Sequence, residues 1–294
     1  MRPIRALLIY LILVFLGGAL LAPWLWHLAQ FFSSPFPKIA AAPFHRFLDR
    51  AFLLLALVGI WPLMRSLGAT SWPEVGLPLP HGQMKKLSGG FLLGLLSLGM
   101  VAAIEIGAGR RAFNHVAAHQ IVSAIISAFA TAAVVAILEE ILFRGAIFGG
   151  LRRVLYWPFA LFFSSIIFAF VHFLSRADIA GPVEWDSGLV LLSRLFDLHA
   201  FIPGFLGLTL VGLILGLAYQ RTGTLYFSIG LHGTWILILK IVSSLTVQVT
   251  AANNTFWGSD KMVDGWLSFI ALAFTLAILN FLPLERRPPY LILK

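Results

Sequence analysis

The chain has 294 residues, of which 60% are hydrophobic and only 11% are charged, a composition that excludes a soluble globular domain. The formal net charge is +9, but the basic residues are scattered over short segments between apolar runs. We therefore interpret them as topology signals and lipid-headgroup contacts, and expect no nucleic-acid partner. The absence of cysteine excludes disulfides, thiolate nucleophiles and cysteine-ligated metals.

Long apolar segments recur along the whole chain, and about 20 apolar residues are enough to span the hydrocarbon layer of a bilayer. These segments predict an all-α fold: a polytopic membrane helix bundle of about eight transmembrane helices, forming a single transmembrane domain over residues 1–294. The predicted spans are, in chain order, about 6–28, 52–67, 87–107, 120–151, a fifth that follows Pro158 and ends near 174, 201–219, 224–247 and 263–284.

Two of the predicted spans carry glycines four residues apart, a spacing that lets neighbouring helix backbones approach closely. These pairs are Gly90 with Gly94 in the third span and Gly212 with Gly216 in the sixth. The fourth span, 120–151, is longer than a bilayer requires, so we expect it to tilt or to break.

The basic amino-terminal residues precede an apolar run that is long for a signal peptide, so we expect a retained first helix. Lysines and arginines are somewhat more frequent in the loops on the amino-terminal side than in the alternate loops. Since cytoplasmic loops are enriched in these residues, we expect a multi-pass protein of the cell membrane with both termini cytoplasmic.

The segment from Ile137 to Arg144 places two adjacent carboxylates and a guanidinium in an apolar helical run. A charge at the bilayer centre costs ~3 kcal/mol on insertion scales, so such groups pair or face a cavity. Glu140 and Arg144 are four residues apart on one helix face, which predicts a structural ion pair. Glu139 lies roughly 100° around the helix, without a partner in its own turn, and is the carboxylate left for chemistry.

Two histidines lie in neighbouring apolar spans at a compatible depth. The fourth and fifth spans are joined by a short connection, and Glu139 and His172 are equally far from its midpoint along the chain. His232 lies nine residues beyond the turn at Gly223, or ~14 Å along a helix. We therefore expect Glu139, His172 and His232 to meet in one buried layer.

These side chains suit hydrolysis. A carboxylate and an imidazole can deprotonate a water molecule for attack on a carbonyl, and a second imidazole can donate to the oxyanion that forms. The same three side chains, Glu139, His172 and His232, are also a familiar set of zinc ligands. Motifs of other intramembrane proteases, such as His-Glu-x-x-His, Gly-x-Gly-Asp and Gly-x-Ser-x-Gly, are absent from the sequence.

Each polar group also has a simpler possible role. A lone histidine in an apolar span often bonds only to the backbone, so the shared depth is what favours function for His172 and His232. Lys240 is expected to snorkel to the interface or to meet a carboxylate such as Glu105.

The residues between about 120 and 240 resemble the CPBP family of intramembrane proteases, which contains the type II CAAX prenyl endopeptidases and bacteriocin-processing or self-immunity proteins. The family's first motif, Glu-Glu-x-x-x-Arg, matches Glu139, Glu140 and Arg144. Its second motif, Phe-x-x-x-His, matches Phe168 and His172.

The third motif of the family is only partly present. It reads His-x-x-x-Asn or His-x-x-x-Asp, and here His232 is followed at that spacing by Ile236. Trp235 resembles the His-x-x-Trp-Asn version of this motif, which supports the alignment. The amide of the third motif is therefore missing from this chain.

The resemblance implies roles for these residues. Glu139 and His172 would activate water, Glu140 and Arg144 would be structural, and His232 would stabilise the oxyanion. Because Ile236 cannot donate a hydrogen bond, the oxyanion hole would be one donor short, a loss that typically costs ~100- to 1000-fold in turnover.

The sequence thus predicts an intramembrane endopeptidase that hydrolyses a peptide bond in a membrane-associated or lipid-modified, CAAX-like substrate. We expect no cofactor, with zinc as the alternative, and partners limited to membrane lipids and a peptide or membrane-protein substrate. Two other functions stay open: a catalytically silent membrane scaffold or bacteriocin-immunity protein, which Ile236 favours, and a proton-coupled transporter with Glu139, His172 and His232 as a proton relay.

Overall fold

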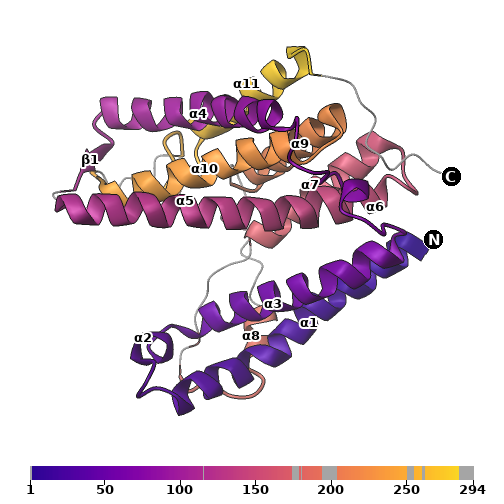
Figure 1. The fold of residues 1–294 in the computed structure, drawn as a ribbon. Coiled ribbons are helices and arrows are strands. Elements are labelled where there is room, and N and C mark those ends of the chain that lie inside the picture. Colours follow the sequence, from indigo (N-terminus) through magenta and orange to yellow (C-terminus); the bar gives the residue numbers. More distant parts are fainter. Residues whose placement is uncertain are drawn as a thin grey trace. The chain divides into compact units, whose positions relative to one another are not determined.

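The computed structural model of the protein is almost entirely helical, which confirms the predicted all-α membrane helix fold (Figure 1). The chain divides into two compact units, Met1–Ala69 with Leu174–His199, and Thr70–Phe173 with Ala200–Lys294. The predictions for the carboxy terminus and for most of the loop after the fifth span fall outside the described residues. The structure describes residues 2–114, 116–173, 179, 181–193, 204–249, 255–259 and 262–284.

The first unit contains two long apolar helices that pack against each other, α1 (Arg2–Phe31) and α3 (Phe44–Ser66). The short helices α2 (Pro37–Ala40) and α8 (Ser187–Ser193) complete it. Helix α3 begins earlier than the predicted span 52–67, because the helix continues through a polar turn that hydropathy alone assigns to the preceding loop.

The second unit contains the predicted site. Helix α10 packs against α4, α5 and α9, and α9 packs against α7 and α11 (Figure 1). Its elements are η1 (Pro73–Val75), α4 (Met84–Gly107), β1 (Arg111–Phe113), α5 (Ala118–Glu140), η2 (Ile141–Phe148), α6 (Gly149–Leu151), α7 (Trp157–Phe173), α9 (Gly204–Thr222), α10 (Tyr226–Leu245), β2 (Thr246–Gln248) and α11 (Trp266–Phe281).

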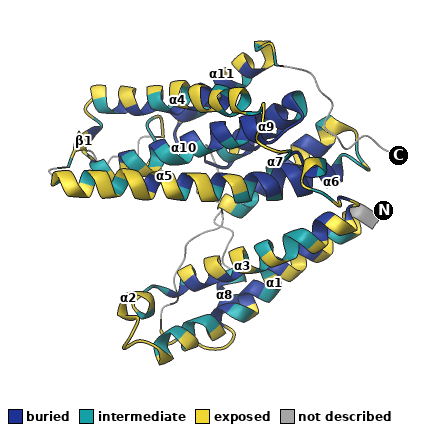
Figure 2. Cartoon of the chain, in the orientation of Figure 1, coloured by how far each residue is buried: buried dark blue, intermediate teal, exposed yellow. Residues whose placement is uncertain are grey.

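Each of the eight predicted spans corresponds to an apolar helical segment. In the described part of the chain, six of these segments are long and apolar enough to cross a membrane, and α7 and α11 are shorter apolar helices. Much of α5 is exposed in Figure 2, and the exposed side chains there are apolar, among them Ile126 and Phe129. Apolar residues on an outer face suit contact with lipid rather than water. The protein is therefore a multi-pass membrane protein.

The predicted glycine pairs mediate close helix packing. A Cβ atom at Gly90 on α4 would lie 2.0 Å from the carbonyl oxygen of Phe227 on α10, and one at Gly230 on α10 would lie 2.1 Å from that of Leu87. On α9, a Cβ atom at Gly212 would lie 2.8 Å from Ser165 Cα on α7. Because no side chain larger than hydrogen fits at these positions, they set the spacing of the helices that carry the site.

The long fourth span breaks as expected. Its first part is the regular helix α5, which passes at Ile141 into the π-helix η2 and then into the short α6. A π-helical stretch rotates the residues that follow it relative to those before it, and such stretches often occur at functional sites. Here the change follows directly after Glu139 and Glu140.

The second unit also contains a short antiparallel ribbon. Its strands β1 and β2 follow the ends of α4 and α10 and pair with each other. Glu105 forms a buried ion pair with Arg111, whose Nε lies 2.7 Å from Glu105 Oε2. The suggested pairing of Glu105 with Lys240 is therefore wrong. The Lys240 residue is exposed on α10, where its long side chain can snorkel.

Candidate active site

A stripe of small residues on α5 leads into the candidate site. Ala128, Ala132, Ala136 and Glu140 are all buried and are spaced four residues apart, so they share one face of the helix. This face lies against α10, since a Cβ atom at Gly233 would be 3.6 Å from Ala136 Cβ. Glu140 therefore lies in the interface of α5 and α10, where the small alanine side chains let the two helices approach closely.

One carboxylate oxygen of Glu140, Oε1, contacts both Arg144 and His232. The Arg144 Nη1 atom donates to Glu140 Oε1 at 2.9 Å, which is the ion pair that the spacing predicted. His232 Nδ1 lies 2.9 Å from the same oxygen. The side chains of Glu140, Arg144 and His232 are 0%, 3% and 8% exposed, so the whole group is shielded from solvent.

The Arg144 guanidinium also contacts a backbone carbonyl and an aromatic ring. Its Nη2 atom lies 3.5 Å from the carbonyl oxygen of Gly212 on α9, and its guanidinium carbon lies 4.6 Å from the centre of the Phe168 ring. These contacts connect η2 to α7 and α9. Such contacts are what a buried guanidinium requires, because an unpaired buried charge is strongly destabilising.

The side chain of His172 is oriented by its own helix. His172 Nδ1 lies 2.8 Å from the carbonyl oxygen of Phe168, one turn earlier on α7. A carbonyl only accepts hydrogen bonds, so the proton is on Nδ1. The other nitrogen, Nε2, then faces Glu139.

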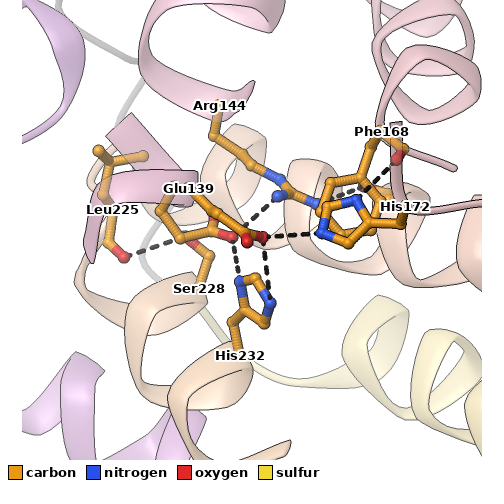
Figure 3. A network of polar contacts seen from close by, with 9 residues as sticks. Glu139, Arg144, Phe168, His172, Leu225, Ser228 and His232 are labelled. Atoms are coloured by element: carbon orange, nitrogen blue, oxygen red, sulfur yellow. Dashed lines mark hydrogen bonds and ion pairs between the residues drawn. The ribbon is translucent and has the colours of Figure 1, made fainter. Parts of the chain in front are cut away.

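The structure brings together the three side chains that the sequence predicts as catalytic, although they come from α5, α7 and α10. Glu139 Oε2 lies 3.2 Å from His172 Nε2 and 3.8 Å from His232 Nε2 (Figure 3). Glu139 and His172 are 24% and 29% exposed, in contrast to Glu140. The arrangement therefore has a buried half, around Glu140, and an accessible half, around Glu139.

The ring of Phe168 packs against both histidines. It lies 4.1 Å from the His172 ring with an interplanar angle of 32°, and 6.1 Å from the His232 ring with an angle of 72°. The same ring contacts the Arg144 guanidinium, so Phe168 restricts the orientation of three polar groups at once. These three contacts give a structural reason for an aromatic residue one turn before His172.

The last two motif positions lie on α10. Trp235 Nε1 donates to the Ser97 hydroxyl at 2.9 Å and so ties α10 to α4. Ile236 is half-buried one turn after His232 and has no polar side-chain atom. The side chain at position 236 therefore supplies no donor to the site.

The alternative zinc site would use Glu139, His172 and His232. His172 Nε2 is in direct hydrogen-bonding contact with Glu139 Oε2, and His232 Nε2 lies 3.8 Å from the same oxygen. No group of three or more His, Asp or Glu side chains within the described ranges is arranged to hold a metal ion. Zinc stays an alternative to metal-independent chemistry at these three side chains, and a metal chelator distinguishes the two.

Sequence reasoning missed the contact between Glu140 and His232, which are 92 residues apart. The four-residue repeat that ends in Glu140 was the available signal, because it marks Glu140 as part of a buried helix face. The carbonyl of Gly212 was also missed, and no pattern in the sequence singles out one backbone carbonyl.

Comparison with known proteins adds one match. Residues 121–238 match the Rce1-like family of type II CAAX prenyl endopeptidases, and this segment contains the site and covers less than half of the chain. No curated protein and no solved structure matches the chain. This segment, with its Glu-Glu-x-x-x-Arg and Phe-x-x-x-His motifs, is similar to the CPBP family of intramembrane proteases.

Proposed function

We propose that the protein is a metal-independent intramembrane endopeptidase in which Glu139 and His172 activate water. The observation that carries the proposal is the 3.2 Å contact between Glu139 Oε2 and His172 Nε2 on two apolar helices, with both side chains partly accessible. The family match over residues 121–238 supports a peptidase in general.

The contact between Glu139 and His172 requires one proton between two atoms that otherwise both accept. In the imidazolium–carboxylate form of the pair, Glu139 removes a proton from water as the hydroxide attacks the peptide carbonyl. His172 then gives its Nε2 proton to the leaving nitrogen, and the carbon–nitrogen bond breaks. Transfer of the proton from Glu139 to His172 Nε2 restores the starting state.

His232 completes the proposed chemistry. Its Nε2 atom lies 3.8 Å from Glu139 Oε2, close to the carboxylate that would activate water. A hydrogen bond from this nitrogen would stabilise the negative oxygen of the tetrahedral intermediate.

The substrate class follows from the location of the site. The three side chains lie on apolar helices that suit a lipid environment, so the substrate is a peptide that is itself membrane-associated or carries a lipid. The family name suggests a CAAX-like, prenylated peptide as one such substrate.

A second candidate is a catalytically silent scaffold or immunity protein. Ile236 favours it, because the side chain at this position cannot donate to an oxyanion. The proton-coupled transporter has no comparable support, since the sequence shows no internal repeat of the kind that many transporters use.

Cleavage of a membrane peptide library by the purified protein tests these functions. We expect cleavage by the wild type, its loss in Glu139→Ala and His172→Ala, and no effect of a metal chelator. The Glu74→Gln variant changes a partly buried carboxylate outside the spans, so it is the control for carboxylate loss and should cleave normally.

Retained cleavage in Glu139→Ala would contradict the mechanism. Loss of cleavage on chelation would favour a zinc-dependent mechanism. If no variant cleaves, the wild type included, the scaffold becomes the better proposal, and proton-driven uptake that depends on Glu139 would instead indicate the transporter.

A further inference from the structure

We propose that Glu140 is a positioning residue for His232 and not only the partner of Arg144. Through Nδ1, Glu140 sets the ring orientation and tautomer of His232, and its charge stabilises the doubly protonated form that can donate from Nε2. This inference rests on the proposed function, in which His232 Nε2 binds the oxyanion.

The first step is the convergence of two donors on one oxygen. Arg144 Nη1 and His232 Nδ1 each lie 2.9 Å from Glu140 Oε1. The pair of Glu140 and Arg144 is formed between the end of α5 and the adjoining η2 and does not need α10. The contact of His232 with the same oxygen is therefore an additional feature of the fold.

The second step concerns the tautomer of His232. A carboxylate paired with a guanidinium only accepts hydrogen bonds, so the proton must be on His232 Nδ1. The neutral ring then has a bare Nε2, which faces the Glu139 carboxylate. In that form His232 cannot donate to an oxyanion, and donation requires a proton on both nitrogens.

The third step is charge. The His232 side chain is 8% exposed and lies near Arg144, so an imidazolium there needs a nearby negative charge. Glu140 supplies that charge directly at Nδ1, while Glu139 lies near Nε2. A carboxylate behind an imidazole has the same role in hydrolytic triads, where it orients the ring and stabilises its charged form.

The test must separate this role from the ion pair, because removing Glu140 alone would leave Arg144 buried without a counter-charge. We therefore compare Arg144→Met, which keeps Glu140, with the double variant Glu140→Met/Arg144→Met, which removes both charges. Met is unbranched and apolar, so it fills most of the volume of either side chain. The Ser228→Ala variant, one turn before His232 on α10, is the control for packing.

We expect the double variant to unfold at a temperature no lower than Arg144→Met, yet to cleave about 100-fold more slowly. Glu140→Gln/Arg144→Met keeps an acceptor for Nδ1 and should recover the ring orientation but not the full rate. Equal cleavage by Arg144→Met and Glu140→Met/Arg144→Met would overturn the proposal.

A spectroscopic measurement separates this inference from the proposed function. In ¹⁵N-histidine-labelled protein in lipid nanodiscs, with His232 assigned by its substitution, we expect a protonated Nδ1 in the wild type and its loss in the double variant. A wild-type His232 protonated at Nε2 alone would refute the inference even if the enzyme cleaves. The expected signals in a protein that cleaves nothing would support the contact and reject only the proteolytic role.

Discussion

Adjacent carboxylates in this protein have opposite environments. Glu139 is 24% exposed and faces two histidines, whereas Glu140 is fully buried and shared by Arg144 and His232. One residue of helical rotation, roughly 100°, accounts for the difference. The two positions should therefore respond differently to the same substitution.

Glu139→Gln should lower turnover by about 100- to 10,000-fold, because it removes the proposed general base. Its unfolding temperature in detergent should stay near that of the wild type, since the side chain is partly exposed. Turnover is measured on any peptide that the library assay identifies. Turnover close to the wild-type rate would show that Glu139 is not the base.

Glu140→Gln should instead lower stability by about 3–5 kcal/mol, because it leaves the Arg144 guanidinium buried without its counter-charge. Thermal unfolding in detergent, beside Glu139→Gln as the matched carboxylate-to-amide change, measures the difference. Equal unfolding temperatures for the two variants would argue against a stabilising ion pair.

Ile236→Asn should raise turnover, by up to about 100- to 1000-fold if the side chain supplies a missing oxyanion donor. Position 236 is one turn after His232 on the same face of α10. The measurement is kcat for the wild type, for Ile236→Asn and for the apolar control Ile236→Leu. A rate unchanged in Ile236→Asn would mean that another group already completes the oxyanion hole.

At the scale of elements, the site depends on how α10 is seated against α4 and α5. The glycines of the α4–α10 interface bring the backbones together, and the alanine face of α5 closes the other side. The π-helix η2 then places Arg144 beside Gly212 on α9. His232 can reach both carboxylates only while these contacts hold.

Gly230→Ala should therefore impair stability and cleavage together, because its Cβ atom would lie 2.1 Å from the Leu87 carbonyl oxygen and push α10 away. Gly107→Ala, at the end of α4, is the control, since a Cβ atom there meets no atom within 4 Å. Unfolding temperature and cleavage rate should fall only for position 230. Normal behaviour of Gly230→Ala would show that the interface can relax.

At the scale of the whole molecule, the remaining prediction is orientation. The natural absence of cysteine makes single-cysteine variants clean reporters. Helix α4 separates His81 from Phe113, and both positions are exposed. With the amino terminus inside, a membrane-impermeant thiol reagent added outside intact cells should label Phe113→Cys and not His81→Cys. The reverse pattern would invert the topology.

Much of the architecture could be predicted from local properties. Long apolar runs identify helices without knowledge of their neighbours, and the i,i+4 spacing of Glu140 and Arg144 defines their pair within one helix. The start of α3 was placed too late, because hydropathy does not recognise a helix that continues through polar residues. The π-helix was anticipated only as a break.

By itself, the sequence determined the membrane class, the helical segments and the family resemblance, because each depends on composition or on spacing along one helix. Only the tertiary structure decided that His232 meets Glu140 through Nδ1 and Glu139 through Nε2. That outcome depends on the rotation and separation of helices from distant parts of the chain. Close packing across several interfaces sets both quantities together, and no single helix encodes them.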